Sequence, residues 1–342
     1  MTERDFRACA TSGAAALQRW YSRSTGLWRG TGWWNSANAL TALIGYIRLT
    51  GDSSYAGVIG TTFTAAQRTH GRFLNSYYDD NAWWALAWIA AYDLTGEERY
   101  LAAARTIFTF NTGGWQAASG GGMVWHRKSG YKNAVTNELF LLLAAQLHQR
   151  LPGEGLPGEA AYLGWALKEW DWFSASGMIG PGGLVNDGLN AEGQNNRGPT
   201  WTYNQGVILG GLTALTEITG DQSCLQQAQA IADAALSQLA SPAAANPAGI
   251  LTEPCEAAGN CDGDQSQFKG IFIRHLYQLW LRSRTPAYRA FILANANSVW
   301  AHGTNAANQS GLRWTGPFDR PDPSRQSSAL EALTAAAALS TP

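Results

Sequence analysis

Charged side chains are scarce in this chain, and their signs balance. Only 14% of the 342 residues are Asp, Glu, Lys or Arg, and 24 basic residues face 25 acidic ones, which gives a net charge of −1. Soluble proteins average about 25% charged residues. Nucleic acids and anionic membrane surfaces select proteins with basic areas. The composition therefore argues against a nucleic-acid partner and against a polybasic membrane surface.

Long apolar runs are also missing. No run of 18 apolar residues occurs, so we expect no membrane-spanning helix. The first seven residues, Met-Thr-Glu-Arg-Asp-Phe-Arg, lack the apolar segment of a signal peptide. Disorder is not expected, because the hydrophobic fraction is 45% and is spread over the whole length.

The chain has four cysteines, and two of them flank a short polar loop. Cys255 and Cys261 bracket Glu-Ala-Ala-Gly-Asn, which predicts a local disulfide between them. Cys9 and Cys224 could pair or remain thiols. A disulfide indicates an oxidising compartment. We therefore expect a secreted or cell-surface protein whose leader has been removed, with a cytoplasmic protein as the alternative.

Motifs for metals, phosphates and activated serines are absent. The five histidines show no ligand spacing, and the fragment Asp262-Gly263-Asp264 lacks the rest of a calcium loop. Neither a phosphate loop nor a Gly-x-Ser-x-Gly elbow occurs. We predict no metal and no cofactor.

Tryptophan, tyrosine and glycine are abundant instead, with 16, 12 and 38 copies. Aromatic rings with a polar tip pack well in cores, and they also stack on the C–H faces of sugar rings. Each single Trp is explained by core packing, but the excess favours a carbohydrate-binding cleft.

The apolar spacing is helical throughout, and a short signature recurs between helices. Leu49-Thr50-Gly51-Asp52, Leu94-Thr95-Gly96-Glu97 and Ile218-Thr219-Gly220-Asp221 each join two periodic segments. The Gly suits the left-handed residue that ends a helix, and the acid suits the start of the next one. The apolar spacing predicts about twelve helices, over residues 5–22, 36–49, 53–67, 81–94, 97–110, 134–149, 158–174, 202–218, 222–239, 268–282, 286–301 and 325–339.

Short turns alternate with long loops along this helical series. The long loops, 112–132, 175–201, 240–267 and 302–324, each follow the second helix of a pair, and loops of such length are usually functional. Six helical hairpins with long loops at one end predict an all-α (α/α)6 barrel in a single domain over residues 1–342. A helical solenoid is the alternative.

The segment Tyr77-Tyr78-Asp79-Asp80-Asn81-Ala82-Trp83-Trp84 places two acids at the start of an apolar helix. A helix cap with a charge that complements the dipole explains an isolated pair. Four aromatics around the acids favour a catalytic pair instead. Neighbouring carboxyls at a helix start lie about 5 Å apart, the spacing of a retaining glycosidase. The helix N-terminus keeps one acid ionised, and that charge raises the pKa of the second.

These residues resemble glycoside hydrolase family 76, the endo-α-1,6-mannanases. The adjacent-aspartate motif is Asp79-Asp80-Asn81-Ala82-Trp83-Trp84. The further motifs, between about residues 32 and 275, are Gly32-Trp33-Trp34, Gly122-Met123-Val124-Trp125, Lys132-Asn133-Ala134, Thr136-Asn137, Trp201-Thr202-Tyr203-Asn204-Gln205-Gly206 and Phe268-Lys269-Gly270-Ile271-Phe272. The resemblance implies an (α/α)6 barrel, Asp79 as the nucleophile and Asp80 as the general acid/base. The adjacency of the two acids predicts retention of the anomeric configuration.

Substrate contacts are expected from the same motifs. The expected ligand is α-mannan, as a polysaccharide or oligosaccharide, bound by a monomer. Asn204 could simply cap a helix, whereas Lys269 near a helix start is unfavourable for the dipole and so favours a functional role. The full set of predicted substrate-binding residues is Trp33, Trp34, Asn81, Trp83, Trp84, Trp125, Asn133, Tyr203, Asn204, Gln205, Phe268 and Lys269.

Three other functions compete with a hydrolase. A terpene cyclase needs DDxxD or DxDD, but Trp83 stands three residues after Asp80 and Tyr77 two before Asp79, so both patterns fail. A non-catalytic carbohydrate-binding protein needs the aromatics without the acid pair. A transglycosylase that remodels cell-wall glycan shares the nucleophile, and a sugar hydroxyl replaces water as the acceptor.

Overall fold

The computed structural model describes residues 5–154, 161–243 and 246–340 and contains thirteen α-helices within them. The helices group into two compact units, residues 1–71 with 236–342 (unit 1) and residues 72–235 (unit 2). Each unit is described by itself, and the single-domain assignment stays a prediction. All twelve predicted helices are present. The first three residues of the helix predicted over 158–174, residues 158–160, lie outside the described residues.

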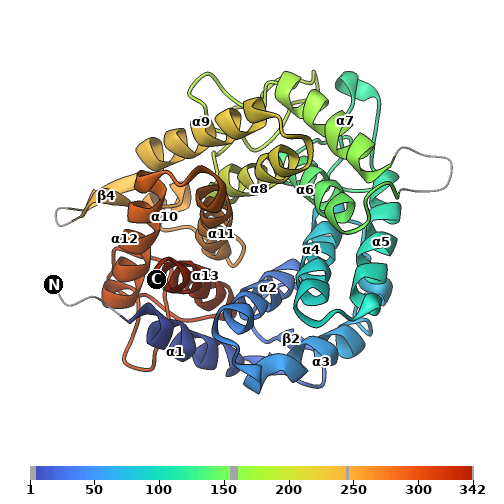
Figure 1. Ribbon diagram of the computed structural model, residues 1–342. Coiled ribbons are helices and arrows are strands. Elements are labelled where there is room, and N and C mark those ends of the chain that lie inside the picture. The colour runs from blue at the N-terminus through green and yellow to red at the C-terminus, as the bar shows by residue number, and fades with distance from the viewer. Residues whose placement is uncertain (1–4, 155–160, 244–245, 341–342) are drawn as a thin grey trace. The chain divides into compact units, whose positions relative to one another are not determined.

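Unit 2 is built from helical hairpins. Its helices are α4 (Tyr78–Thr95), α5 (Glu98–Thr112), α6 (Ala134–Arg150), α7 (Tyr162–Ala175), α8 (Thr202–Thr219) and α9 (Gln222–Gln238), of which α9 ends just past the unit boundary. Helix α6 packs against α4, α7 and α8, and α4 packs against α5 (Figure 1). Stacked aromatics fill the core between these helices: Trp84 on Trp88, Trp88 on Tyr100, and Phe108 on Phe140.

Unit 1 is arranged around its last helix. Its elements are α1 (Phe6–Gln18), β1 (Tyr21–Ser22), β2 (Leu27–Trp28), α2 (Trp33–Thr50), α3 (Ala56–Ala66), β3 (Ala240–Ala243), β4 (Asn246–Leu251), α10 (Pro254–Ala258), α11 (Gln265–Ser283), α12 (Pro286–His302) and α13 (Pro323–Ser340). Helix α13 contacts α1, α2, α11 and α12. Its apolar and small side chains are buried along most of its length, which is typical of a helix enclosed by others.

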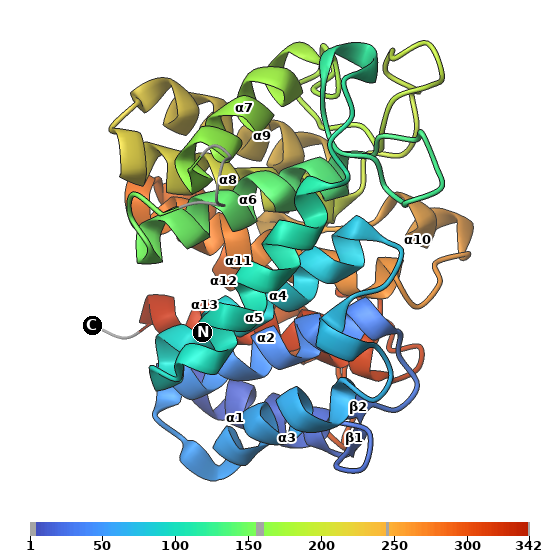
Figure 2. The same cartoon turned by 90° about the vertical axis from the view of Figure 1, so that its right-hand side faces the viewer.

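The strands of unit 1 form two small antiparallel pairs. In the first, Tyr21 faces Trp28, and in the second, Ala240 faces Leu251. The β1–β2 pair lies beside α3 (Figure 2), where the Tyr21 hydroxyl hydrogen-bonds to Thr62 at 3.0 Å. The five-residue helix α10 was not predicted.

The recurring Thr-Gly-acid signature forms the expected turns. Gly51, Gly96 and Gly220 end α2, α4 and α8 in the left-handed region, with φ of 70°, 71° and 74°. In each copy the Thr hydroxyl before the Gly accepts a hydrogen bond from the N–H of the acid. Asp52 and Asp221 also accept from the N–H two residues on, at 2.9 and 2.8 Å, and so cap the next helical segment of the chain. The acid of the middle copy makes no such capping bond.

Candidate active site

The two predicted catalytic acids lie in the first turn of α4. The helix begins at Tyr78, three residues before the predicted start at 81, so Asp79 and Asp80 are its second and third residues. Both side chains are half-buried. The unpaired N–H groups of a first helical turn favour negative charge at this position.

Asp79 receives a hydrogen bond on each carboxylate oxygen. The backbone N–H of Asp80 donates to Oδ1 at 3.0 Å, and the indole N–H of Trp125 donates to Oδ2 at 2.9 Å. Trp125 lies 46 residues further along the chain. A loop that follows α5 therefore helps to hold the carboxylate of Asp79 in place.

Asp80 is held by a residue that precedes the helix. The side-chain amide of Asn75 donates to Oδ2 of Asp80 at 2.6 Å, and its Oδ1 accepts from the N–H of Tyr77 at 2.8 Å. Because a backbone N–H only donates, the oxygen of the Asn75 amide must face Tyr77 and the nitrogen must face Asp80.

Asn81 anchors the segment in front of the helix rather than facing solvent. Its Oδ1 accepts from the N–H of Asn75 at 2.8 Å, and its Nδ2 donates to Oδ1 of Asn111 at 3.4 Å. Asn111 in turn donates to the carbonyl of Tyr78 at 2.9 Å. Asn81 is fully buried, so the structure favours a positioning role for it over direct contact with a sugar.

The electrostatics of the pair favour retention of a proton. Burial, and then the negative charge of Asp80, raise the pKa of Asp79 well above its ordinary value, and the N–H donors on Asp79 oppose the rise. Two carboxyls this close in the chain titrate as a unit, so the pair holds one shared proton to higher pH than isolated aspartates do.

Exposed aromatics lie beside the acids. Tyr77 and Trp125 are 38% and 36% exposed, the ring centroids lie 5.0 Å apart, and the ring of His126 lies 4.6 Å from that of Tyr77. Exposed large hydrophobic side chains are otherwise few among the described residues. The arrangement presents flat apolar surface next to the carboxylates, which suits the predicted role of Trp125.

A cavity of about 660 Å³ opens among the loops of unit 2. Tyr131 lines it, and its hydroxyl donates to Oδ2 of Asp187 at 2.5 Å and accepts from the amide of Asn196 at 3.1 Å. The ammonium of Lys132 is directed into backbone carbonyls, including that of Gln116 at 3.1 Å. The lining therefore offers hydroxyl and amide groups to a ligand, with little free charge.

Other predicted contacts at the start of α6 and α8 are buried. Asn133 precedes α6 and is 7% exposed, and Asn204 and Gln205 in α8 are fully buried. The amide of Gln205 accepts from the N–H of Val185 at 2.7 Å and donates to its carbonyl at 2.8 Å, so it holds the loop before α8. Neither amide atom of Asn204 has a hydrogen-bond partner. Tyr203 is half-buried.

Two predicted contacts in α4 belong to the aromatic core. Trp84 is fully buried and stacks on Trp88 with centroids 5.6 Å apart, and Phe73 packs against it at 5.2 Å. Trp83 is 3% exposed. For both tryptophans, burial favours packing over the predicted contact with substrate.

The remaining predicted contacts belong to unit 1. Trp33 and Trp34 are half-buried at the start of α2. The indole N–H of Trp34 donates to Oδ1 of Asp264 at 3.0 Å, and its ring lies 6.2 Å from that of Phe268, which is buried. Burial, and then the charge of Asp262, raise the pKa of Asp264.

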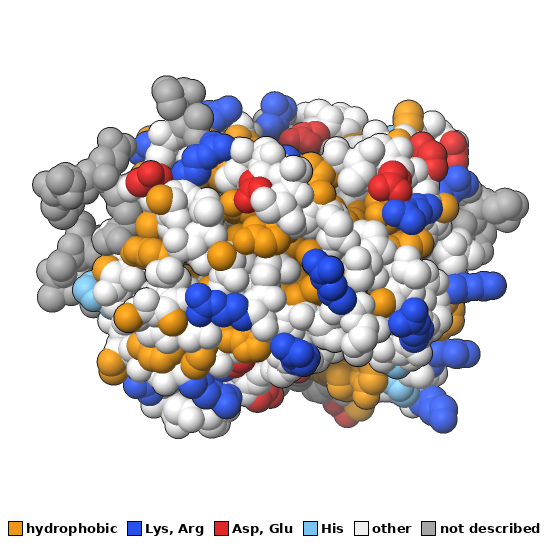
Figure 3. Space-filling view, turned by 90° about the horizontal axis from the view of Figure 1, so that it is seen from below, with side chains coloured by type: hydrophobic (Ala, Val, Ile, Leu, Met, Phe, Trp, Pro, Cys, Tyr) orange, Lys and Arg blue, Asp and Glu red, His pale blue; other side chains and the backbone are white. Residues whose placement is uncertain are grey.

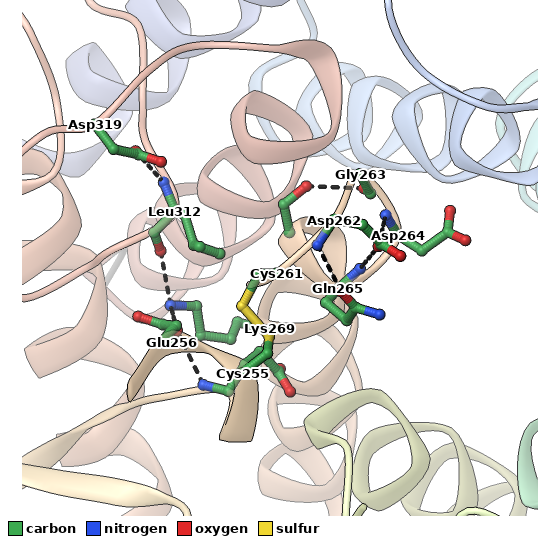
Figure 4. Close-up of a disulfide and its surroundings, with 12 residues drawn as sticks. Cys255, Glu256, Cys261, Asp262, Gly263, Asp264, Gln265, Lys269, Leu312 and Asp319 are labelled. Carbon is green, nitrogen blue, oxygen red and sulfur yellow. Dashed lines mark hydrogen bonds and ion pairs between the residues drawn. A yellow bond between two sulfur atoms is a disulfide. The ribbon is translucent and has the colours of Figure 1, made fainter. Parts of the chain in front are cut away.

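The surroundings of Lys269 favour a role other than the predicted contact with substrate. It is fully buried, and its ammonium contacts Glu256 and the carbonyl of Leu312 (Figure 4). The predicted disulfide between Cys255 and Cys261 is present next to this ion pair. Burial and these contacts favour a structural role for Lys269 within unit 1. Cys9 and Cys224 are buried thiols.

Charges on the surface shown in Figure 3 are dispersed. Lysine and arginine side chains stand at separate places among apolar and uncharged atoms on that face. Within residues 5–154, 161–243 and 246–340, no cluster of three or more His, Cys, Asp or Glu residues could hold a metal ion. Over the same stretches, none of the helices is both long and apolar enough to span a membrane.

Several residues around the acids were not predicted. Asn111 and Tyr131 carry no local motif that marks them, because their partners are distant in the chain. Asn75 had a usable signal, since an Asn that stands three residues before a helix start commonly bonds the backbone ahead of it. The buried Glu138 of α6 was missed as well. Burial raises its pKa, and the charge of Asp187 adds to the rise.

Comparison with known proteins identifies the family. The profile of Glycosyl hydrolase family 76 matches residues 8–342, and the chain belongs to this family. A solved structure of an inactive variant of an α-1,6-mannanase of this family from Salegentibacter sp. HEL1_6, in complex with α-1,6-mannotetrose, is 26% identical. It matches with a TM-score of 0.86 over 98% of this chain and 100% of that one. The predicted all-α fold class, with the (α/α)6 assignment of the family, is confirmed.

Curated relatives are longer proteins. The mannan endo-1,6-α-mannosidase DCW1 of Saccharomyces cerevisiae is 28% identical over 289 residues, which is 77% of this chain and 61% of that protein. A putative mannan endo-1,6-α-mannosidase of Schizosaccharomyces pombe is 26% identical over 265 residues, or 71% of this chain and 57% of that protein. The chain thus spans less than two thirds of the length of these relatives.

Proposed function

We propose that this protein is a retaining endo-α-1,6-mannosidase that cleaves the backbone of α-mannan. The observation that carries the proposal is the pair of consecutive carboxylates at the start of α4, in which Trp125 holds Asp79 and Asn75 holds Asp80. Family membership and the α-1,6-mannanase structure support the substrate class. That structure is of an inactive variant in which two consecutive aspartates are alanine, which supports the same pair here.

The proposed reaction is a double displacement. A carboxylate oxygen of Asp79 attacks C1 of the mannosyl unit and forms a glycosyl ester, while Asp80 gives its proton to the departing glycosidic oxygen. Asp80 then removes a proton from water, and the water oxygen attacks C1 and releases Asp79. Two inversions at C1 leave the α configuration unchanged.

The protonation state of the pair supports this cycle. The mechanism needs one carboxylate and one carboxylic acid at the same time. Burial and mutual repulsion raise the pKa of Asp79, and so favour a singly protonated pair over a fully ionised one. Two N–H groups donate to Asp79, and the Asn75 amide donates to Asp80. We infer that the two donors on Asp79 outweigh the Asn75 donor on Asp80, so that the charge lies on Asp79 and the proton on Asp80.

The surroundings suit a neutral polysaccharide. The exposed rings of Tyr77 and Trp125 offer stacking surfaces beside the acids, and the cavity lined by Tyr131 and Asn196 offers hydroxyl and amide groups. Sugars need this combination of flat apolar and neutral polar contacts.

Digestion of α-1,6-mannan tests the proposal. Wild-type protein should release mannooligosaccharides, and NMR of the first product should show the α-anomer. Asp79→Asn and Asp80→Asn should each lose most turnover while the double variant loses little more, because the two residues act as one unit. Asp171→Asn, at an exposed position on α7, is the matched control and should remain active. A β-anomer appearing first would overturn the role of Asp79.

Product analysis also separates the competing functions. A hydrolase gives the same product sizes with and without added mannobiose, whereas a transglycosylase gives elongated products when this acceptor is present. A carbohydrate-binding protein without activity binds mannan but releases no sugar at any enzyme concentration.

We also propose that the protein acts as a monomer outside the reducing cytosol, at the cell surface or in secreted form. The disulfide between Cys255 and Cys261 supports this location, because such bonds persist in oxidising compartments. Thiol titration of the denatured protein isolated from its native cells should find two reactive cysteines. Four reactive cysteines would indicate a reducing compartment and contradict the proposed location. Sedimentation of the active protein tests the proposed monomer, and an oligomer would contradict it.

A further inference from the structure

Trp125 is fixed on several sides beside the acid pair. Its backbone N–H donates to the carbonyl of Tyr131 at 2.8 Å, and its carbonyl accepts from the N–H of Tyr78, the first residue of α4, at 3.0 Å. Its ring lies 5.0 Å from that of Tyr77 and meets the ring of Tyr131 edge-on at 6.3 Å. The indole N–H is therefore held in the direction of Oδ2 of Asp79, at 2.9 Å.

The two groups that hydrogen-bond to the Asp79 carboxylate in this arrangement can only donate. An indole N–H only donates, and so does the backbone N–H of Asp80 on the other oxygen of Asp79. A donor-only neighbour stabilises the carboxylate more than the carboxylic acid. Of the two ways to place one proton on the pair, the contact with Trp125 thus favours the one with the charge on Asp79.

We propose that Trp125 is a positioning residue that keeps the negative charge of the singly protonated pair on Asp79, in addition to the stacking surface its ring offers. This inference rests on the proposed function, in which Asp79 must be ionised when it attacks. The indole N–H orients the attacking carboxylate and also sets which of the two acids carries the proton.

The charged groups around Asp79 in unit 2 are few. Asp80 is the neighbour whose charge acts on it. In the loop that carries Trp125, the ring of His126 lies against Tyr77, and the guanidinium of Arg127 lies 5.4 Å from the ring centre of Phe110. Helix α6 packs against α4 and contributes the buried Glu138. Helix α5 also packs against α4, and its charged residues, at 98, 99 and 105, lie in the first half of α5, away from the start of α4. None of these is altered by a substitution at position 125.

Trp125→Phe tests the proposal, because it keeps an aromatic ring and removes the N–H. The acidic limb of the pH profile of kcat/KM should move to higher pH by about one unit, the size expected for loss of one hydrogen bond to a charged group. At the wild-type optimum, kcat should fall by at most about tenfold, because a tenfold change in the ratio of the two protonation arrangements lowers the fraction with the charge on Asp79 by no more than that. The KM for α-1,6-mannan should change less than threefold.

Trp170→Phe on α7 is the matched control, because it makes the same substitution at a ring that packs against Phe173. It leaves the contact between Trp125 and Asp79 in place and should leave the acidic limb unchanged. A Trp125→Phe variant with raised KM and an unmoved acidic limb would overturn the proposal and leave Trp125 as a substrate contact alone. Wild-type protein that does not cleave mannan would instead overturn the proposed function.

NMR of the wild-type protein gives a second test that needs no altered tryptophan. The assigned indole N–H resonance of Trp125 should shift with pH, and the midpoint of this shift should equal the midpoint of the acidic limb of the activity profile. The shift should vanish in Asp79→Asn. If the chemical shift of this indole N–H in the wild type did not change with pH, the proposal would be overturned, even if Trp125→Phe failed to fold.

Discussion

The ammonium nitrogen of Lys269 lies 2.5 Å from Oε1 of Glu256, and both side chains are buried within unit 1 (Figure 4). The same ammonium donates to the carbonyl of Leu312 at 2.8 Å, which ties α11 to the loop before α13. Glu256 also caps its own short helix, because its carboxylate accepts from the backbone N–H of Glu253 at 2.9 Å. One ion pair thus joins α10, α11 and a distant loop.

Removal of one partner of this ion pair should be costly. Lys269→Met keeps the length of the side chain but leaves Glu256 buried without its cation, and such losses cost about 3–5 kcal/mol. Denaturant unfolding should show this decrease in the free energy of unfolding. The double variant Lys269→Met with Glu256→Gln should be more stable than the single one, because no uncompensated charge remains. Equal stability of wild type and Lys269→Met would contradict a paired, buried ammonium.

The disulfide next to this pair should add a smaller amount. Cys255 and Cys261 are six positions apart, and closing so short a loop restricts the unfolded chain by about 2 kcal/mol. Replacement of both cysteines by Ala should lower the free energy of unfolding by that amount. Reductant should destabilise the wild type to the level of the variant and should leave the variant unchanged. Sensitivity of the variant to reductant would assign the effect to another pair of thiols.

Lys269 also shows where prediction from sequence stopped. A lysine near a helix start is unfavourable for the helix dipole, and this suggested a functional side chain. Its partner Glu256 lies in α10, a helix of five residues that is too short to show apolar periodicity. The charge of Lys269 is therefore balanced by a residue of a helix that the sequence pattern does not reveal.

The helices themselves were predictable because each carries its own local signal. Apolar spacing marked twelve of them, and glycines such as Gly51 and Gly96 marked where they end. The start of α4 was missed because its first turn is polar and aromatic. The pairing of Asp79 with Trp125 spans 46 residues and depends on how the loop after α5 returns to α4, for which the sequence holds no periodic pattern.

His275 should make the stability of the protein depend on pH. Its ring is buried, and burial, together with the charge of Arg274, lowers its pKa to about 3, while its hydrogen bond with Gln278 acts in the opposite direction. An unfolded chain has an ordinary histidine pKa of about 6.5. Between these values the unfolded state binds a proton that the folded state does not. The free energy of unfolding should therefore fall as pH falls from about 6.5, by at most about 1.4 kcal/mol per pH unit.

Comparison of wild type with His275→Gln isolates this effect. Buried carboxyls with raised pKa, such as Glu331, act with the opposite sign but are common to both proteins. The stability difference between the two should shrink as pH falls below 6.5. His302→Gln, at an exposed position, is the control and should leave the slope unchanged. Parallel pH curves for wild type and His275→Gln would contradict the lowered pKa, because they would mean that His275 binds its proton equally in the folded and unfolded states.

Two glycines in helices of unit 1 should respond oppositely to alanine. At Gly270 of α11, an added Cβ would lie 2.5 Å from the Cα and the carbonyl oxygen of Ser328 in α13, so backbone would have to move. The Ser328 hydroxyl also accepts from the N–H of Gly270 at 2.8 Å, and separating the helices would weaken that bond. At Gly45 of α2, an added Cβ meets nothing within 4 Å. Gly270→Ala should therefore lower the free energy of unfolding by about 1–3 kcal/mol. Gly45→Ala should raise the free energy of unfolding by about 0.5–1 kcal/mol, because alanine restricts the unfolded chain more than glycine does. Thermal unfolding of both variants measures the two shifts, and a Gly270→Ala variant as stable as wild type would show that α11 and α13 do not pack this closely.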